Sequence, residues 1–522
     1  MLGSQDKQTS LLDLEAWLDG PLVDPDSIYG LFARWGERLI REEDFADLYS
    51  AVGRPSVSPA LLSKVLLLMY HDNVSDREAE QRARYDLRWK KALGLGLNET
   101  GFDHTALCRF RTRLLLNKQQ KLVFERFVRL AKETGILKDR GLQILDSTQV
   151  LGAGALQDTY TLIKKAIQKM FAVSSHAGGT ARDRLNALSL SLDYSQNGKE
   201  KIRWDDAEAR TQLLRQLVGD GRAILDALKG AELTADEKTA MELLGNVTEQ
   251  DIVTDDTGIH LKQGVAPDRI LSVTDPDMRH GHKTSSGRFN GHKSQILMDE
   301  ASELITGIDI TAGNRPDGES VDPLLAGTLV KPGKLLGDTA YGTLEARDQM
   351  AKHQVTPVAP LPGAHAPKKR FGKQDFTIDF GQGICWCPAG EITATVRHRK
   401  GGIDVFVFPK ATCNRCKFRD QCTRHGKGKT IELHSQEERR REILAEMATE
   451  EFRTLYVKRA KVERKVAHLI RKGMRQARYI GRTKTLLQVA FTAAVVNIKR
   501  LYTLTRDQVC PSVGLPAVLV GQ

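Results

Sequence analysis

Three acidic residues stand where their side chains could hold divalent cations. Asp146 ends the apolar run QILD, Asp338 ends the run KLLGD, and Glu463 lies inside the basic segment YVKRAKVERKVAHLIRK. Carboxylates brought together from two strand ends and a facing helix can hold two Mg²⁺ ions roughly 3.5–4 Å apart. Such a pair stabilises the attacking and leaving oxygens of an in-line phosphoryl displacement, and Mg²⁺ accepts carboxylates together with substrate phosphates. The three acids are therefore a candidate metal site.

Each of these acids also has a simpler interpretation. The chain contains 66 acidic residues, and an aspartate at the end of a strand is commonly a turn or cap residue. Glu463, surrounded by Lys and Arg, could equally form salt bridges on a helix surface. Three further aspartates compete for the second position of the site: Asp275, Asp277 and Asp299.

The segment around Glu463 holds the basic surplus of the chain. Lys and Arg number 78 and the net charge is +12; between Glu451 and Arg500 there are 14 basic and 2 acidic residues, so this block carries the whole surplus. Tyr456, Arg459 and Glu463 are spaced i, i+3 and i+7, which predicts that they share one helix face. Cationic neighbours suit a carboxylate whose substrate is a polyanion, because they position the phosphates.

The composition excludes several classes of protein. No run of 18 apolar residues occurs, so we expect no membrane-spanning helix. The opening MLGSQDKQTS lacks a basic stretch followed by an apolar core, and we therefore expect no secretory signal. The basic surplus favours a polyanionic partner such as nucleic acid. These features together predict a cytoplasmic protein.

Residues 1–135 are expected to be helical throughout. Ser58–Pro59 is typical of a helix start, with a capping hydroxyl before a proline at the first helical position. The next helix carries Arg82 and Arg84, and a third is expected over His104–Leu116. A helix, a short turn and a basic helix favour a DNA-binding domain of the helix-turn-helix kind. The alternative is a small helical bundle with a solvated basic face.

Residues 136–363 change to an α/β pattern. Helical periodicity fills about 158–268, which we interpret as an insertion. Strands alternating with helices predict an α/β layer. The strand-like segments are residues 141–154, 292–299, 303–313 and 334–342.

Five of the seven cysteines cluster in residues 364–435, a second insertion. A Cys-x2-Cys pair with one cysteine before and one after can supply four thiolates to a structural Zn²⁺. The predicted ligands are Cys387, Cys413, Cys416 and Cys422, and Cys385 competes with Cys387 for the first place. A reduced, metal-free cluster is the alternative. Residues 436–522 form the C-terminal part, with one or two long helices expected from Ser435 to Leu501.

Several motifs together resemble the DDE transposases of bacterial insertion sequences. ILDST around Asp146 resembles the family's first Asp on its first strand, and GDTAYG resembles its Asp-x-Gly-Tyr element after the fourth strand. YVKRAKVE resembles the Tyr-x2-Arg-x3-Glu signature, with Glu463 as the third acid. The tail RYIGRTKTLLQVAFTAAVVNIKRL resembles the closing helix, and Phe45–Leu116 resembles the helical domain that precedes many such cores.

This resemblance implies an α/β fold: a ribonuclease-H-like catalytic core with a helical and a cysteine-rich insertion, preceded by an all-helical DNA-binding domain. It implies cleavage and strand transfer of double-stranded DNA, at element ends and in target DNA, with Asp146, Asp338 and Glu463 holding two Mg²⁺ ions that Mn²⁺ can replace. It also implies a homodimer in the synaptic complex and a nucleoid location in the bacterial cytoplasm. The residues expected to contact DNA are Tyr456, Arg459, Arg464, Arg471, Lys472, Arg82 and Arg84.

The sequence departs from the family pattern at two places. Ala340 replaces the usual glycine of GDTAYG, and Ile470 stands where a lysine often follows the Glu, so Arg471 or Lys472 would take that role. Two other functions stay open on the residues: a DNA-binding regulator without catalysis, and a metal-dependent nuclease without strand transfer.

Overall fold

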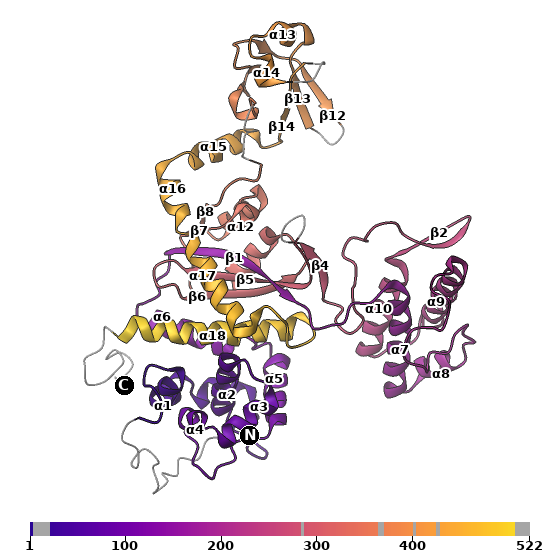
Figure 1. The fold of residues 1–522 in the computed structure, drawn as a ribbon, viewed down its shortest axis with the longest axis vertical. Helices are drawn as coiled ribbons and strands as arrows, with labels where there is room; N and C mark the ends of the chain where they lie inside the picture. Colours follow the sequence, from indigo (N-terminus) through magenta and orange to yellow (C-terminus); the bar gives the residue numbers. More distant parts are fainter. Residues whose placement is uncertain (4–20, 283–286, 364–369, 400–402, 424–427, 507–522) are drawn as a thin grey trace.

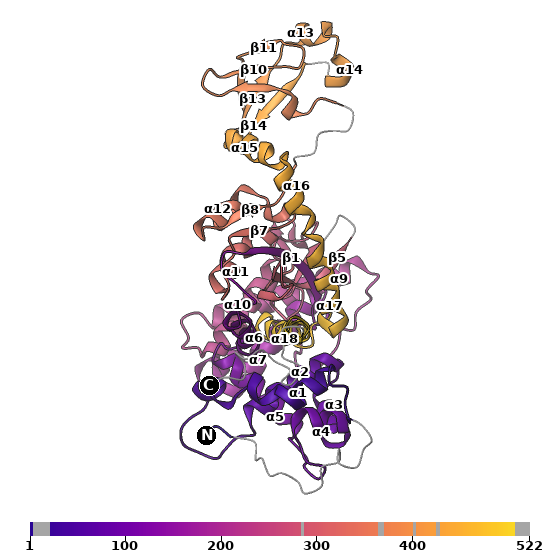
Figure 2. The ribbon, with the colours of Figure 1, turned by 90° about the vertical axis from the view of Figure 1, so that its left-hand side faces the viewer.

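We describe the protein from a computed structural model, shown in Figure 1. The structure describes residues 1–3, 21–282, 287–363, 370–399, 403–423 and 428–506. A mixed sheet lies at the centre, with the helical N-terminal domain at one end and the cysteine-rich lobe at the other, as Figure 2 also shows. The helical insertion projects to one side of the sheet in Figure 1.

The central sheet has the strand order β4-β5-β1-β7-β8. β6 also pairs with β5, on the edge away from β1 and next to β4. β5 runs antiparallel to β1, β4 and β6, whereas β1, β7 and β8 are parallel. The expected α/β layer is therefore confirmed. The strands are β1 (Leu142–Leu151), β4 (Arg279–His282), β5 (Arg288–Asp299), β6 (Ile305–Ala312), β7 (Lys334–Leu336) and β8 (Thr356–Val358).

Helices cover both faces of the sheet because successive side chains of a strand point to opposite faces. Ile144 of β1 packs in one apolar cluster with Val462 of α17, and Leu145 packs in another with Leu324 of α11. The short elements and helices around the sheet are η3 (Asp317–Ser320), α11 (Val321–Gly327), η4 (Thr339–Tyr341) and α12 (Leu344–Lys352).

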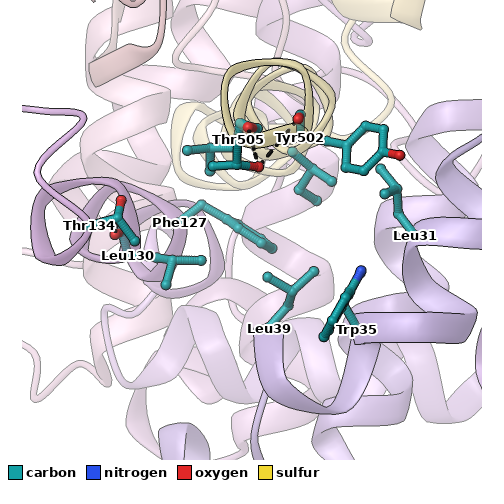
Figure 3. A pocket seen from close by; sticks show the side chains of 10 residues that line it. Leu31, Trp35, Leu39, Phe127, Leu130, Thr134, Tyr502 and Thr505 are labelled. Carbon is teal, nitrogen blue, oxygen red and sulfur yellow. Dashed lines mark hydrogen bonds between the residues drawn. The ribbon is translucent and has the colours of Figure 1, made fainter. Parts of the chain in front are cut away.

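The N-terminal domain consists of helices that share one apolar core with α18. α2 is buried on all sides, Ser58 caps it as expected, and Pro59 is its first residue. In Figure 3 side chains of α1, α6 and α18 meet around a cavity of about 40 Å³, including Trp35, Phe127 and Tyr502. The elements are α1 (Ile28–Leu39), η2 (Glu42–Leu48), α2 (Pro59–Asp72), α3 (Asp76–Tyr85), α4 (Leu87–Leu93), α5 (His104–Leu116) and α6 (Leu122–Glu133).

The stretch between β1 and β4 forms a separate helical cluster with its own apolar core. A hairpin, which the helical periodicity did not predict, closes it. Its elements are α7 (Thr159–Ala177), α8 (Thr180–Asn186), α9 (Ala207–Ala227), α10 (Ala235–Glu249), β2 (Ile252–Asp255) and β3 (Gly258–Leu261).

The cysteine-rich lobe contains two small sheets, β11-β10-β9 and β12-β13-β14. Helices α15 (Glu437–Met447) and α16 (Glu450–Val457) join it to α17 (Ala460–Leu469) on the central sheet (Figure 2). The elements of the lobe are η5 (Lys373–Asp375), β9 (Thr377–Asp379), β10 (Ile384–Trp386), β11 (Ile392–Thr393), β12 (Val396–Arg399), β13 (Ile403–Val407), α13 (Lys410–Arg415), α14 (Arg419–Cys422) and β14 (Thr430–Leu433).

The sequence predicted one or two long helices for the C-terminal part, and this prediction is wrong. This part consists of α15 (Glu437–Met447), α16 (Glu450–Val457), α17 (Ala460–Leu469), η6 (Ile470–Met474) and α18 (Arg482–Arg506). Gly473 interrupts the helical backbone inside η6 with φ of 87°, a conformation that favours glycine. A Cβ at this position would stand 2.5 Å from Oδ1 of Asn73, so the N-terminal domain closes against the break.

No described helix is both long enough and apolar enough to span a bilayer.

Candidate active site and metal centres

Asp146 and Asp338 occupy equivalent places on two neighbouring parallel strands. Ile144 of β1 is paired with Leu336 of β7, and each aspartate follows two residues later. Because residues two apart on a strand share a face, both carboxylates are expected on the face that carries α17. Oδ1 of Asp146 accepts the amide of Ser147 at 2.9 Å, and Oδ1 of Asp338 accepts that of Ala340 at 2.9 Å. The hydrogen bond of Asp338 caps η4, the role open to any such aspartate, whereas Asp146 lies inside β1. Both bonds fix the direction of the carboxylate.

Glu463 reaches the same region from α17. Val462 anchors the helix over β1, which leaves the Glu463 side chain 60% exposed. Arg459 lies between two of the predicted ligands: Nη1 is 3.8 Å from Oδ2 of Asp146 and Nη2 is 2.8 Å from Oε1 of Glu463. One guanidinium therefore joins the first and third acids of the candidate site.

Tyr456 does not share a helix with Glu463. α16 ends at Val457 and α17 begins at Ala460, so the face predicted from the i, i+3, i+7 spacing is interrupted. Tyr456 stacks on Phe452 with ring centroids 5.8 Å apart, against the apolar cluster over the sheet. Burial of these two rings favours the break, because it turns α16 toward the sheet surface.

A polar network on the other face of the sheet links the loops of the two aspartates. Asp317 accepts the Ser147 hydroxyl at 3.0 Å and the Gln295 amide at 3.3 Å, and it pairs with Lys293 at 3.1 Å. The Tyr341 hydroxyl donates to Oε1 of Gln295 at 2.7 Å. The network thus ties the neighbour of Asp146 to the GDTAYG loop.

Sequence reasoning missed this network. Asp317 lies in GNRPDGES, where no periodicity or motif distinguishes it from a loop aspartate. Tyr341 is fully buried, and burial raises its pKa well above 10, with the nearby charges of Asp317, Asp146 and Asp338 adding to the shift. The phenol therefore stays protonated and acts as a donor.

Replacing Tyr341 by phenylalanine should lower the stability of the sheet domain by about 1–3 kcal/mol, because Oε1 of Gln295 would lose its buried donor. Urea unfolding followed by fluorescence measures the change. Tyr456→Phe is the matched control, since its hydroxyl makes no hydrogen bond within the described residues. Equal urea midpoints for the two variants would show that the network does not stabilise the protein.

The three competing aspartates have other contacts. Asp275 is fully buried with Oδ2 3.7 Å from Nε2 of His292. Asp277 accepts the amide of Arg482 at the start of α18, and Asp299 accepts the amide and hydroxyl of Ser302. Asp277 and Asp299 thus stabilise a helix start and a turn, whereas the buried carboxylate oxygens of Asp275 have no hydrogen-bond partner among the described residues.

Among the described residues, one group of three His, Cys, Asp or Glu side chains lies close enough to share an ion: Glu80, Asp103 and His104 in the N-terminal domain. Its imidazole Nδ1 is 2.8 Å from Oε2 of Glu80. The predicted triad is not drawn together to that extent, and Arg459 stands between two of its members.

The cysteine-rich lobe gathers four sulfurs around one cavity, those of Cys387, Cys413, Cys416 and Cys422. No three of these sulfurs lie within 4.8 Å of one another in the described structure. Backbone amides point at two of them, Phe418 N at Cys416 Sγ and Lys429 N at Cys413 Sγ, both at 3.4 Å. Burial raises the pKa of Cys422, and the neighbouring sulfurs add to the rise.

Cys385 stands apart from this cavity. Its side chain is fully buried in the apolar core of the lobe, and burial raises the pKa of its thiol to about 11. Cys387, in contrast, lines the cavity together with Cys413, Cys416 and Cys422. The structure thus favours Cys387 over Cys385 for the first ligand position.

The other predicted DNA contacts divide into two groups. Arg82 pairs with Asp72 at 2.9 Å and Glu78 at 2.8 Å, and Arg84 is 3.8 Å from Glu80, so both are engaged inside the N-terminal domain. On the C-terminal helices, Arg464 is 64% exposed. Arg471 and Lys472 line a hollow between η6 and α18.

Two family models match the chain. Residues 22–113 match the model described as Transposase domain (DUF772), and residues 386–502 match the Transposase DDE domain. Both matches are to transposase domains, and they support a DDE-type transposase of an insertion sequence. Neither the curated proteins nor the solved structures gave a match. In this transposase the DDE model covers Glu463 and the four cavity cysteines, and Asp146 and Asp338 lie before it.

Proposed function

We propose that this transposase binds the ends of its element and uses Asp146, Asp338 and Glu463 to catalyse metal-dependent DNA cleavage and strand transfer. The observation that supports the proposal is the register of β1 and β7, which pairs the residues two positions before Asp146 and Asp338. Arg459 lies within ion-pair distance of both Asp146 and Glu463. The guanidinium of Arg459 already lies between these two carboxylates, so their spacing suits a positive charge, such as a metal ion, bound between them.

The donor set fits Mg²⁺, because the three residues offer carboxylate oxygens and the exposed Glu463 leaves room for phosphate. When bound, two such ions would stabilise the negative charge on the attacking and leaving oxygens. Mn²⁺ accepts the same ligands and can replace Mg²⁺. The chain's own part is to orient Asp146 and Asp338 through their hydrogen bonds to backbone amides and to present Glu463 from the helix.

Arg459 has two roles in this proposal. Without metal it neutralises Asp146 and Glu463, which would otherwise repel each other. With metal in place its guanidinium turns to a DNA phosphate, for which its planar fork is suited. Water attacks the phosphodiester in the cleavage step and the freed 3′-hydroxyl attacks target DNA in the joining step, so the protein forms no covalent intermediate.

The core would be ribonuclease-H-like. In support, three antiparallel strands, β1, β5 and β6, are followed by β7 and β8 parallel to β1. Asp146 stands on the first of these strands and Asp338 follows the fourth, the places that the family resemblance implies.

The lobe around Cys387, Cys413, Cys416 and Cys422 would hold a structural Zn²⁺. Thiolates are the preferred ligands of this ion, and the two amides aimed at sulfur would stabilise their negative charge. Four protein ligands leave no open position, so the ion would hold the lobe's small sheets together and take no part in the reaction.

The partner would be double-stranded DNA, both at the element ends and at the target, bound in the bacterial nucleoid by a homodimer that brings two ends together. The test incubates the purified protein with duplexes that carry the element's terminal repeats, a target plasmid and Mg²⁺. We expect nicked ends and joined products. Nicking without joining would make the protein a nuclease, and binding without nicking would make it a regulator; either result would overturn the proposal.

A further inference from the structure

A basic hollow of about 510 Å³ lies between α17, η6 and α18. Two acidic side chains, Glu303 and Asp26, also border it. Six Lys and Arg side chains line it: Lys465, Arg471, Lys472, Lys499, Arg500 and Arg506. We call this site the basic groove.

The basic groove faces away from the candidate active site. Around a helix of 3.6 residues per turn, Lys465 and His468 lie roughly 200° and 140° from Glu463. Both line the groove, whereas Glu463 points toward Asp146 through Arg459. DNA bound at the carboxylates would therefore lie on the side of α17 opposite to the basic groove.

The positive charge of the basic groove is only partly neutralised by the described residues. Glu303 is shared by Arg464 and Lys465, and Asp26 lies 3.8 Å from Arg506. No carboxylate of the described ranges lies within ion-pair distance of Arg471 or Lys499.

The titratable groups of the basic groove respond to this surplus. Burial lowers the pKa of His468, and the charges of Lys465, Arg471 and Lys499 lower it further, while Glu303 opposes them. Burial also lowers the pKa of Lys465, whose side chain is only 5% exposed. Like charges held this close are costly unless an anion binds among them.

We propose that the basic groove binds the phosphate backbone of a second stretch of duplex DNA, separate from the DNA at the carboxylates. Val495 to Arg506 of α18 extend about 16 Å at 1.5 Å per residue. Over this length a duplex carries about ten phosphate charges, one per ~1.7 Å. Two duplexes on opposite flanks of α17 would suit an enzyme that joins one DNA to another, so the inference rests on the proposed function.

The test compares Arg471→Glu/Lys499→Glu with Arg182→Glu/Lys238→Glu, a control with the same change of charge at exposed sites on the helical insertion. Binding of a short duplex is titrated at several salt concentrations, and the number of duplexes per protomer is measured by analytical ultracentrifugation. We expect the groove variant to bind one duplex fewer per protomer. Its affinity should fall at least about tenfold and its logarithmic salt slope by about 2.

The control variant should match the wild type in stoichiometry and slope. Equal stoichiometry in the groove variant would overturn the proposal, as would a change confined to its self-association, which would make the basic groove a protein contact. If the double variant does not fold, Lys499→Gln alone provides the test, because this side chain is exposed. Failure of the proposed function is seen separately, as a wild type that binds DNA and never cuts it.

Discussion

Replacing Asp146 by asparagine should reduce metal-dependent DNA cleavage at least about a thousandfold, equivalent to roughly 4 kcal/mol of lost transition-state stabilisation. The amide keeps the shape of the side chain and can still accept the Ser147 amide, so the fold of β1 is retained. It loses the charge that pairs with Arg459 and that would bind metal. A gel assay of nicked element ends measures the loss, and DNA affinity is measured in parallel.

The matched control is Asp309→Asn. Asp309 lies on β6 of the same sheet, opposite Gln295 of β5, and is partly exposed. This variant should cleave at the wild-type rate. Loss of DNA binding in Asp146→Asn, without any cleavage by the wild type, would instead support a regulator that uses the aspartate for structure.

Removal of zinc should unfold the cysteine-rich lobe. Structural Zn²⁺ contributes about 10–16 kcal/mol of apparent binding free energy in small zinc domains, far more than a lobe with a few short strands gains from its own core. We therefore expect Cys413→Ser to abolish zinc in metal analysis and to expose residues 371–433 to limited proteolysis. The central sheet and the N-terminal domain should resist the protease, because their apolar cores are separate from that of the lobe.

Cys108→Ser provides the control, because Cys108 is exposed on α5 and distant in sequence from the lobe. It should keep its zinc and its resistance to protease. A wild-type protein without zinc, whose lobe withstands both chelator and protease, would contradict the assignment.

The sequence predicted the parts of the site that depend on local patterns. The run KLLGD placed Asp338 just after a strand, and the Ser58–Pro59 cap placed the start of α2. The run QILD placed Asp146 on a strand, but not at its end, because β1 continues to Leu151. These signals lie within a few residues of one another, so no knowledge of the tertiary structure is needed to interpret them.

The parts that the sequence did not predict depend on distant contacts. Gly473 breaks the C-terminal helices because Asn73, 400 residues earlier, approaches it. Asp317 matters only because the pairing of β1 with β5 places Ser147 beside Gln295. The basic groove is divided between α17 and α18, and its direction relative to Glu463 follows from how these helices pack against the sheet.

The most direct measurement of the central claim locates the catalytic metal on the chain. Fe²⁺ replaces Mg²⁺ in the purified protein, and peroxide with ascorbate then generates hydroxyl radicals that cut the polypeptide beside the bound ion. The account predicts cuts near Asp146, Asp338 and Glu463 that excess Mg²⁺ suppresses and Asp146→Asn removes. Cuts confined to the neighbourhood of Glu80, Asp103 and His104, the other acidic group of the structure, would contradict it.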